Sequence, residues 1–204
     1  SPRTHRALTG HLAVRCGARL FVPDYRLAPE HPFPAGLDDV VTAYRGLLDT
    51  GVEPGEIVVA GDSAGGGLAV AAALRLRDLG QPLPRALVLF SPLADLAREY
   101  PEVPPHGEVM LTPAWLRECA RAYVAAGDPR DPLISPVAAD LLATFRQRHA
   151  LAVSYVRAYR AYCWPVESLA DLKLAPFHLL ASEGSVHVGR DHLWHLRTIE
   201  SLCQ

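Results

Sequence analysis

The feature of this sequence that most limits its possible folds is an apolar run that passes through a glycine-rich turn into a helical segment. The apolar run is EIVVAGD, residues 56–62, and after Ser63 the chain continues as AGGGLAVAAALRLRDLG. A continuous apolar run of this length is typical of a strand that is buried on both faces of a parallel sheet. The Ala- and Leu-rich segment that follows favours a helix. We therefore expect a strand at 56–62 and a helix at 65–80.

Similar segments on both sides of this unit predict an alternation of helices and strands. Apolar residues at helical spacing predict helices, two of them closed by Gly17 and Gly51, and short apolar runs have the length of strands. The further expected helices are 4–17, 37–51 and 189–202, and the further expected strands are 18–25, 85–92 and 177–182. Residues 95–140 are expected to form loop and helix. This order predicts an α/β fold with an open, mostly parallel sheet flanked by helices.

The size and charge of the chain limit the number of domains and the classes of partner that are possible. Its 204 residues suffice for a single domain with a buried core. A net charge of −2 argues against nucleic acid or an anionic membrane as the main partner. No apolar run approaches the roughly 20 residues of a membrane span, and the first residues do not resemble a signal peptide.

The cysteines predict a reducing environment and no metal site. They lie far apart, without the spacing of metal ligands, at Cys16, Cys119, Cys163 and Cys203. Such cysteines are typical of free thiols in a reducing compartment, so a cytoplasmic location is predicted. We expect neither a metal ion nor another cofactor.

The turn at Ser63 has the pattern of a nucleophilic serine. Residues 61–65 read Gly-Asp-Ser-Ala-Gly, which fits G-x-S-x-G between a predicted strand and a predicted helix. A sharp turn of this kind exposes the serine hydroxyl at the carboxyl end of the sheet, and small neighbours let the strand and the helix approach each other. The alternatives are a turn that merely starts a helix and one that cradles a phosphate. The glycines are not followed by G-K-[ST], which excludes a P-loop.

Three longer stretches carry a resemblance to a known family. They are GARLFVPDYRLAPEHPFPAGLDDVVTAYRGLLD, VVAGDSAGGGLAVAAALRLRD and DPLISPVAADL. These stretches resemble the hormone-sensitive-lipase-like branch of the α/β-hydrolases, microbial carboxylesterases and lipases that act on short and medium acyl esters. The resemblance runs from Thr4 to Leu141 and implies a small-molecule ester as substrate. It implies that Ser63 is the nucleophile and the Ala64 N–H an oxyanion donor. It also implies that Asp24 and Glu30 are structural: buried or hinge-side carboxylates held by backbone N–H groups.

The resemblance also points to a catalytic histidine. In such enzymes the acid and then the histidine follow the serine along the chain. The stretch LLASEGSVHVGRD fits the family pattern E-G-x-x-H, with Glu183, Gly184 and His187 in register. A base on a loop after a strand can reach the serine hydroxyl, so His187 is the expected general base.

The chain departs from the family at the catalytic acid. The acid is expected near residue 157, but no Asp or Glu lies between Asp140 and Glu167. A carboxylate in this role fixes the tautomer of the histidine, and its replacement by an amide in a serine protease costs roughly 10⁴ in kcat. Glu167 and Asp171 are the candidate substitutes. The alternative is that the chain has no catalytic acid, which favours a non-catalytic protein.

Two further departures concern the ends of the matching region. The His-Gly-Gly motif that completes the oxyanion hole is absent before Ser1, so the resemblance implies a partial α/β-hydrolase fold whose first strands are missing. Within one domain, residues 1–141 match the family, 142–178 diverge, and 179–204 supply the last strand, the histidine loop and a closing helix. One hypothesis for the divergence is that 142–178 are translated outside the ancestral reading frame, which the coding DNA would reveal.

Three functional hypotheses remain open at this point. In the first hypothesis, the chain is a serine carboxylic ester hydrolase of the EC 3.1.1 class, with full or impaired activity. Alternatively, it is a non-catalytic remnant that binds a small ligand, or an inactive truncated or frame-shifted hydrolase. The sequence leaves open assembly into a homo-oligomer.

Overall fold

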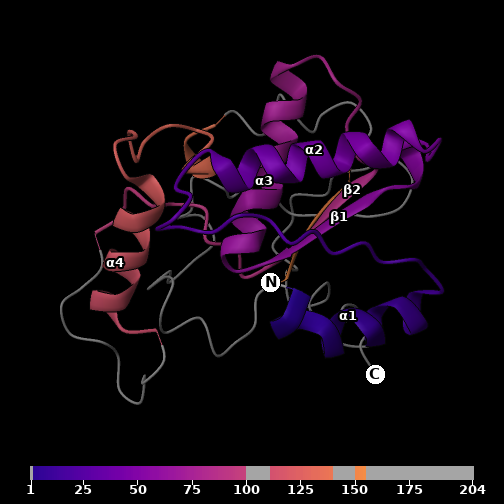
Figure 1. Ribbon diagram of the computed structural model, residues 1–204, viewed down its shortest axis with the longest axis horizontal. Coiled ribbons are helices and arrows are strands. Elements are labelled where there is room, and N and C mark those ends of the chain that lie inside the picture. The colour runs from indigo at the N-terminus through magenta and orange to yellow at the C-terminus, as the bar shows by residue number, and fades with distance from the viewer. Residues whose placement is uncertain (1, 100–110, 140–149, 155–204) are drawn as a thin grey trace, which may run out of the picture.

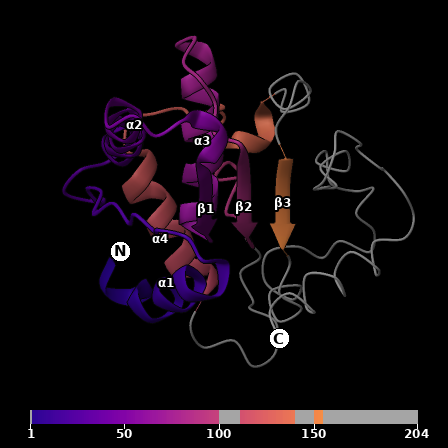
Figure 2. The same ribbon diagram turned by 90° about the vertical axis from the view of Figure 1, so that its right-hand side faces the viewer.

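The computed structural model describes residues 2–99, 111–139 and 150–154, and contains a parallel sheet with helices packed on it (Figure 1). The strands of the described residues are β1 (Val58–Asp62), β2 (Ala86–Phe90) and β3 (Ala150–Ser154). They lie in the order β1-β2-β3 and are all parallel, with Asp62 opposite Phe90 and Phe90 opposite Ser154. Figure 2 shows the three arrowheads pointing the same way. An open parallel sheet was predicted, and it is confirmed.

The helices confirm most of the expected elements. The α-helices of the described residues are α1 (Pro2–Cys16), α2 (Ala35–Asp49), α3 (Ala64–Asp78) and α4 (Pro113–Val124), and the short 3₁₀-helices are η1 (Pro54–Glu56) and η2 (Pro136–Ala138). Gly17 and Gly51 have φ of 59° and 86° just beyond α1 and α2. This left-handed conformation is the one that glycine provides at a helix end. Both glycines therefore close their helices as predicted.

Helix α3 is the centre of the fold. Its residues from Gly66 to Leu74 are buried, and so is Leu76. One side packs with Leu87 and Leu89 of β2, and the other side packs with Leu37 and Val41 of α2. A helix that is apolar all round is one that is buried all round. The sheet, α3 and α2 thus form successive layers, and the start of α3 sits at the carboxyl end of β1.

The strand expected at residues 18–25 is not formed. These residues are irregular in the structure, and Phe21 is 62% exposed. A strand exists only where a second strand pairs with its backbone. Among the described residues, β1 pairs with β2, and no strand pairs with residues 18–25. The prediction was wrong because an apolar run of strand length does not by itself supply a partner.

The burial expected for β1 is also wrong, and one strand was not predicted. Residues along β1 alternate between exposed and half-buried, with Val58 51% exposed. Helix α3 covers one face of β1, and within the described residues β1 is an edge strand. Strand β3 lies inside the segment 142–178, for which no strand was expected. It pairs with β2 along its whole length.

Some expected elements lie outside the described residues. These are the strand at 177–182 and the helix at 189–202. Within the part of the chain that is described, no helix is long and apolar enough to cross a membrane.

Candidate active site

The backbone at Ser63 is strained. Ser63 has φ 53° and ψ −118°, between the end of β1 and the start of α3. A non-glycine residue with positive φ costs of order 1–3 kcal/mol and persists only where its surroundings enforce it. Ser63 is half-buried at the carboxyl end of the parallel sheet. The sharp strand-to-helix turn expected from the sequence is therefore present.

Four hydrogen bonds hold this turn in place. The Ser63 N–H donates to the carbonyl of Phe90 at 2.9 Å. The Ser63 carbonyl accepts from the N–H groups of Gly66 at 2.9 Å, Gly67 at 3.2 Å and Leu93 at 2.9 Å. Phe90 ends β2 and Leu93 lies in the loop after it. The last residue of β2 and the loop after β2 thus hold the turn through both the N–H and the carbonyl of Ser63, which is what a strained residue requires.

Glycines are needed at three positions around the turn. A Cβ at Gly61 would overlap the backbone of Gly65, and a Cβ at Gly67 would overlap the carbonyl of Leu93. At Gly66 a Cβ would lie 2.8 Å from the Cβ of Pro92. Gly65, in contrast, has nothing within 4 Å of its added Cβ. The close approach expected within G-x-S-x-G is confirmed at its first glycine, and it extends beyond the pattern to the next two.

Ser91 is a second strained serine at the same edge of the sheet. It follows β2 directly, as Ser63 follows β1, and has φ 44°. It is 7% exposed, and its hydroxyl has no hydrogen-bond partner among the described residues. No motif in the sequence marks this residue. Its signal is structural: strain and an unpaired buried hydroxyl in one residue, beside the turn.

The Ala64 N–H is the oxyanion donor expected from the sequence. Ala64 is the first residue of α3 and is exposed. The first N–H groups of a helix have no acceptor within the helix, and they carry its partial positive charge. The Ala64 N–H is therefore one of the groups at this edge that can serve an anion.

Two carboxylates expected to be structural lie on the surface instead. Asp24 and Glu30 are both exposed, so the expectation of buried carboxylates is wrong. The carboxylate that accepts a backbone N–H from this loop is Asp39 of α2, which receives the Arg26 N–H at 2.8 Å. Residues 24–34 do not form a buried strand end, which leaves the two side chains in solvent.

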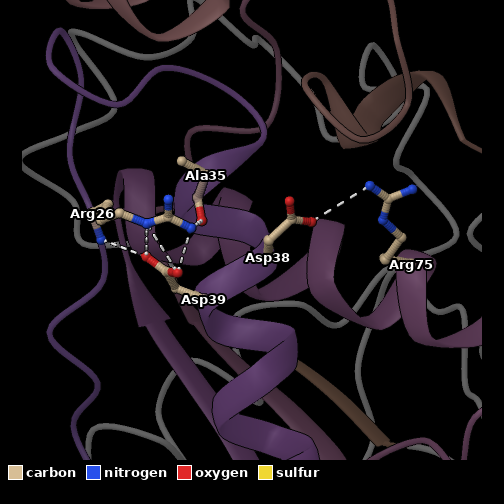
Figure 3. Close-up of polar contacts among 5 residues, drawn as sticks. All are labelled: Arg26, Ala35, Asp38, Asp39 and Arg75. Carbon is tan, nitrogen blue, oxygen red and sulfur yellow. Dashed lines mark hydrogen bonds and ion pairs between the residues drawn. The ribbon is translucent and has the colours of Figure 1, made fainter.

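Arg26 and Asp39 join the loop of residues 24–34 to α2 (Figure 3). The Arg26 Nε donates to Oδ2 of Asp39 at 2.9 Å, and Nη2 donates to Oδ1 at 2.7 Å. The same Nη2 donates to the Ala35 carbonyl at 3.4 Å. These hydrogen bonds lower the pKa of Asp39 and raise the pKa of Arg26. A bidentate contact of this kind fixes the orientation of the loop as well as binding it to α2.

We expect Asp39→Asn to lower the free energy of unfolding at neutral pH by about 0.5–1 kcal/mol, a small effect because the pair is partly exposed. The lowered pKa means that Asp39 stabilises the fold above its unfolded pKa of about 3.9, and that this contribution disappears as the pH falls through the lower folded value. The difference between wild type and variant should therefore shrink below about pH 4. Urea denaturation at several pH values measures it.

The neighbouring Asp38 is the matched control. It lies one position earlier on α2 and contacts only Arg75 in Figure 3, at 3.6 Å, with its side chain 52% exposed. Asp38→Asn should change the free energy of unfolding less than Asp39→Asn. Equal losses for both variants would show that the paired contact with Arg26 contributes no more than a loose surface pair.

Helix α4 holds the other end of the same loop. The Phe33 N–H donates to the Tyr123 carbonyl at 2.9 Å, and the two rings meet edge to face with centroids 6.0 Å apart. Burial raises the pKa of Tyr123 to about 12, with a contribution from Tyr25. The loop thus lies between α2 and α4.

The remaining expected site residues lie outside the described part of the chain. These are His187, the proposed base, and Glu167 and Asp171, the proposed acids. Within the described residues, no group of three or more His, Cys, Asp or Glu side chains could hold a metal ion. The structure therefore brings together Ser63 and Ala64, and leaves the histidine and the acid as predictions.

Comparison with known proteins decides the family. A profile described as alpha/beta hydrolase fold matches residues 1–172. The chain belongs to the α/β-hydrolase family. A solved esterase from the bacterial hormone-sensitive lipase family is 40% identical, with a TM-score of 0.67 over 76% of this chain and 52% of that one. A second structure, the hormone-sensitive lipase homologue EstE7 from a metagenome library, is 41% identical with a TM-score of 0.67, over 76% and 53%.

Curated relatives of this α/β-hydrolase chain bear the names of ester-cleaving enzymes. An acetyl-hydrolase of Streptomyces hygroscopicus is 50% identical over 143 residues, which are 69% of this chain and 48% of that protein. An esterase of Acinetobacter venetianus is 37% identical over 144 residues, 69% of this chain and 48% of that protein. The chain thus spans about half the length of the curated relatives it matches. The resemblance to the hormone-sensitive-lipase-like branch is confirmed.

Proposed function

We propose that this α/β-hydrolase chain supplies the nucleophile of a carboxylic ester hydrolase that acts on short and medium acyl esters. The observation that carries the proposal is the strained Ser63 at the carboxyl end of the parallel sheet, held by backbone hydrogen bonds with the last residue of β2 and with the loop after it. A serine at a sharp strand-to-helix turn of this kind typically presents its hydroxyl at the carboxyl end of the sheet. The names of its relatives support the same class of reaction.

The proposed reaction has two steps. The Ser63 hydroxyl attacks the ester carbonyl carbon, its proton passes to His187, and the alcohol leaves with that proton. Water then attacks the acyl-serine ester, which releases the carboxylic acid and restores Ser63. The Ala64 N–H stabilises the negative oxygen in both steps. Glu167 or Asp171 would orient His187.

Covalent labelling tests the nucleophile directly. A p-nitrophenyl alkylphosphonate should react once per chain: the Ser63 oxygen bonds to phosphorus, p-nitrophenolate leaves, and the serine proton passes to the base. We expect the mass increase on the peptide that contains Ser63. A label that is absent, or that resides on another serine such as Ser91, would contradict the proposal.

Two further properties belong to this proposal. A cytoplasmic location is supported by Cys16 and Cys119, which are exposed free thiols of a kind usual in reducing compartments. The second property is assembly into a homo-oligomer, which rests on no contact within the described residues.

A further inference from the structure

A histidine of α1 contacts the residue that immediately precedes Ser63. The His5 Nε2 lies 3.2 Å from Oδ2 of Asp62, the last residue of β1. The other ring nitrogen, Nδ1, lies 2.8 Å from the Thr4 Oγ1. In addition, the Thr9 hydroxyl donates to the His5 carbonyl at 3.0 Å. His5 is thus held through its ring and its backbone, with one ring nitrogen on the Asp62 carboxylate.

The chemistry of the two groups assigns the donor in the contact between His5 and Asp62. An ionised carboxylate can only accept hydrogen bonds, so Nε2 must carry the hydrogen. The Thr4 hydroxyl can donate to Nδ1 of a neutral ring or accept from Nδ1–H of a protonated ring. Nε2–H of His5 can therefore donate to Asp62 whichever of the two hydrogen bonds Nδ1 makes with Thr4.

Stability does not explain this contact. The side chains of His5 and Asp62 are 37% and 43% exposed, and ion pairs as exposed as this contribute little to folding. Helix α1 has no buried residue of its own. Figure 2 nevertheless shows α1 beside the carboxyl ends of the strands, the edge at which Ser63 lies. The contact places α1 and a histidine at this edge without adding to the core.

The charge of Asp62 matters for chemistry at Ser63. When a serine attacks an ester, negative charge develops on the former carbonyl oxygen, and catalysis depends on groups that favour this charge. A free carboxylate on the adjacent residue opposes it by charge repulsion. A hydrogen bond from His5 restricts the carboxylate and partly offsets its charge.

We propose that His5 is a positioning residue that binds the Asp62 carboxylate to α1 and limits the effect of its charge on the transition state at Ser63. The proposal rests on the proposed function, since it requires Ser63 to act as the nucleophile. His5 contacts neither the substrate nor the reacting atoms in this role. Its effect should therefore appear in kcat, where transition-state charge acts, and much less in KM.

The test compares kcat and KM for p-nitrophenyl butyrate among variants of the full chain. His5→Ala should lower kcat about tenfold, less than the 10²–10³ that removing a direct oxyanion donor costs, while KM changes less than about twofold. His5→Gln should retain most of kcat, because its amide N–H can still donate to Asp62. His11→Ala, at an exposed position of the same helix, should leave both constants unchanged.

Adding Asp62→Asn to His5→Ala distinguishes an effect of His5 on the charge of Asp62 from an effect on the docking of α1. If His5 acts on the charge of Asp62, then His5→Ala with Asp62→Asn should have a higher kcat than His5→Ala alone. If His5 only docks α1, removing that charge brings no recovery, and the proposal is overturned. Circular dichroism and thermal melting of each variant establish that the fold is retained.

The remaining outcomes distinguish this inference from the proposed function. Wild-type kcat in His5→Ala, together with loss of activity in Ser63→Ala, overturns the role of His5 and leaves the proposed function standing. Activity that survives Ser63→Ala overturns the proposed function, and the role of His5 falls with it. A folded wild-type chain that hydrolyses no ester would also overturn both the proposed function and the role of His5.

Discussion

Replacing Ser63 by alanine should reduce ester hydrolysis to the level of the buffer blank, a loss of at least about 10³-fold in kcat. The reason is that the hydroxyl forms the covalent bond to the acyl group, and an alanine methyl group cannot form that bond. Release of p-nitrophenol from p-nitrophenyl butyrate measures the rate. The strain at this position is the same in Ser63→Ala as in the wild type, because alanine, like serine, disfavours φ 53°.

Ser63→Gly is the matched variant for this experiment. It should be as inactive as Ser63→Ala but more stable, by about 1 kcal/mol, because glycine adopts positive φ without strain. Inactivity of both variants, with this order of stability, separates the loss of the nucleophile from a loss of folding. If wild type and both variants equal the blank while the chain is folded, a ligand-binding remnant or an inactive hydrolase becomes the better account.

The second large effect is expected at Gly61. Gly61→Ala should lower the free energy of unfolding by about 3 kcal/mol, at the upper end of the cost of overpacking. Its Cβ would overlap the Gly65 carbonyl group and lie 2.6 Å from the Gly66 nitrogen. These backbone atoms cannot move easily, because the Gly66 N–H donates a hydrogen bond to the Ser63 carbonyl. Urea denaturation measures the change.

Gly65→Ala is the control for this prediction. It lies four residues further along the same turn and helix, with open space around the added Cβ. Because alanine favours a helix more than glycine does, Gly65→Ala should leave stability unchanged or raise it by up to about 1 kcal/mol. Similar destabilisation at both positions would show that close approach of β1 and α3 is not what requires glycine at Gly61.

The comparison of 18–25 with 150–154 shows the limit of prediction from sequence. Both segments are short and apolar, yet only 150–154 is a strand, because it lies beside β2 and pairs with it. Pairing depends on which backbone lies alongside, and an apolar run does not reveal that. For the same reason, the exposure of Val58 could not be read from the apolar run that contains it.

At the candidate site, the sequence by itself determined the strand, the turn at Ser63 and the helix that follows. Those features depend on neighbouring residues: a short continuous apolar run, helical propensity and the small size of glycine. Only the tertiary structure decided the need for Gly66 and Gly67, the strain at Ser91, and the contacts of His5 with Asp62 and of Arg26 with Asp39. Each of these, apart from the strain at Ser91, depends on residues that are distant in the chain and meet only when the helices, loops and sheet have packed together.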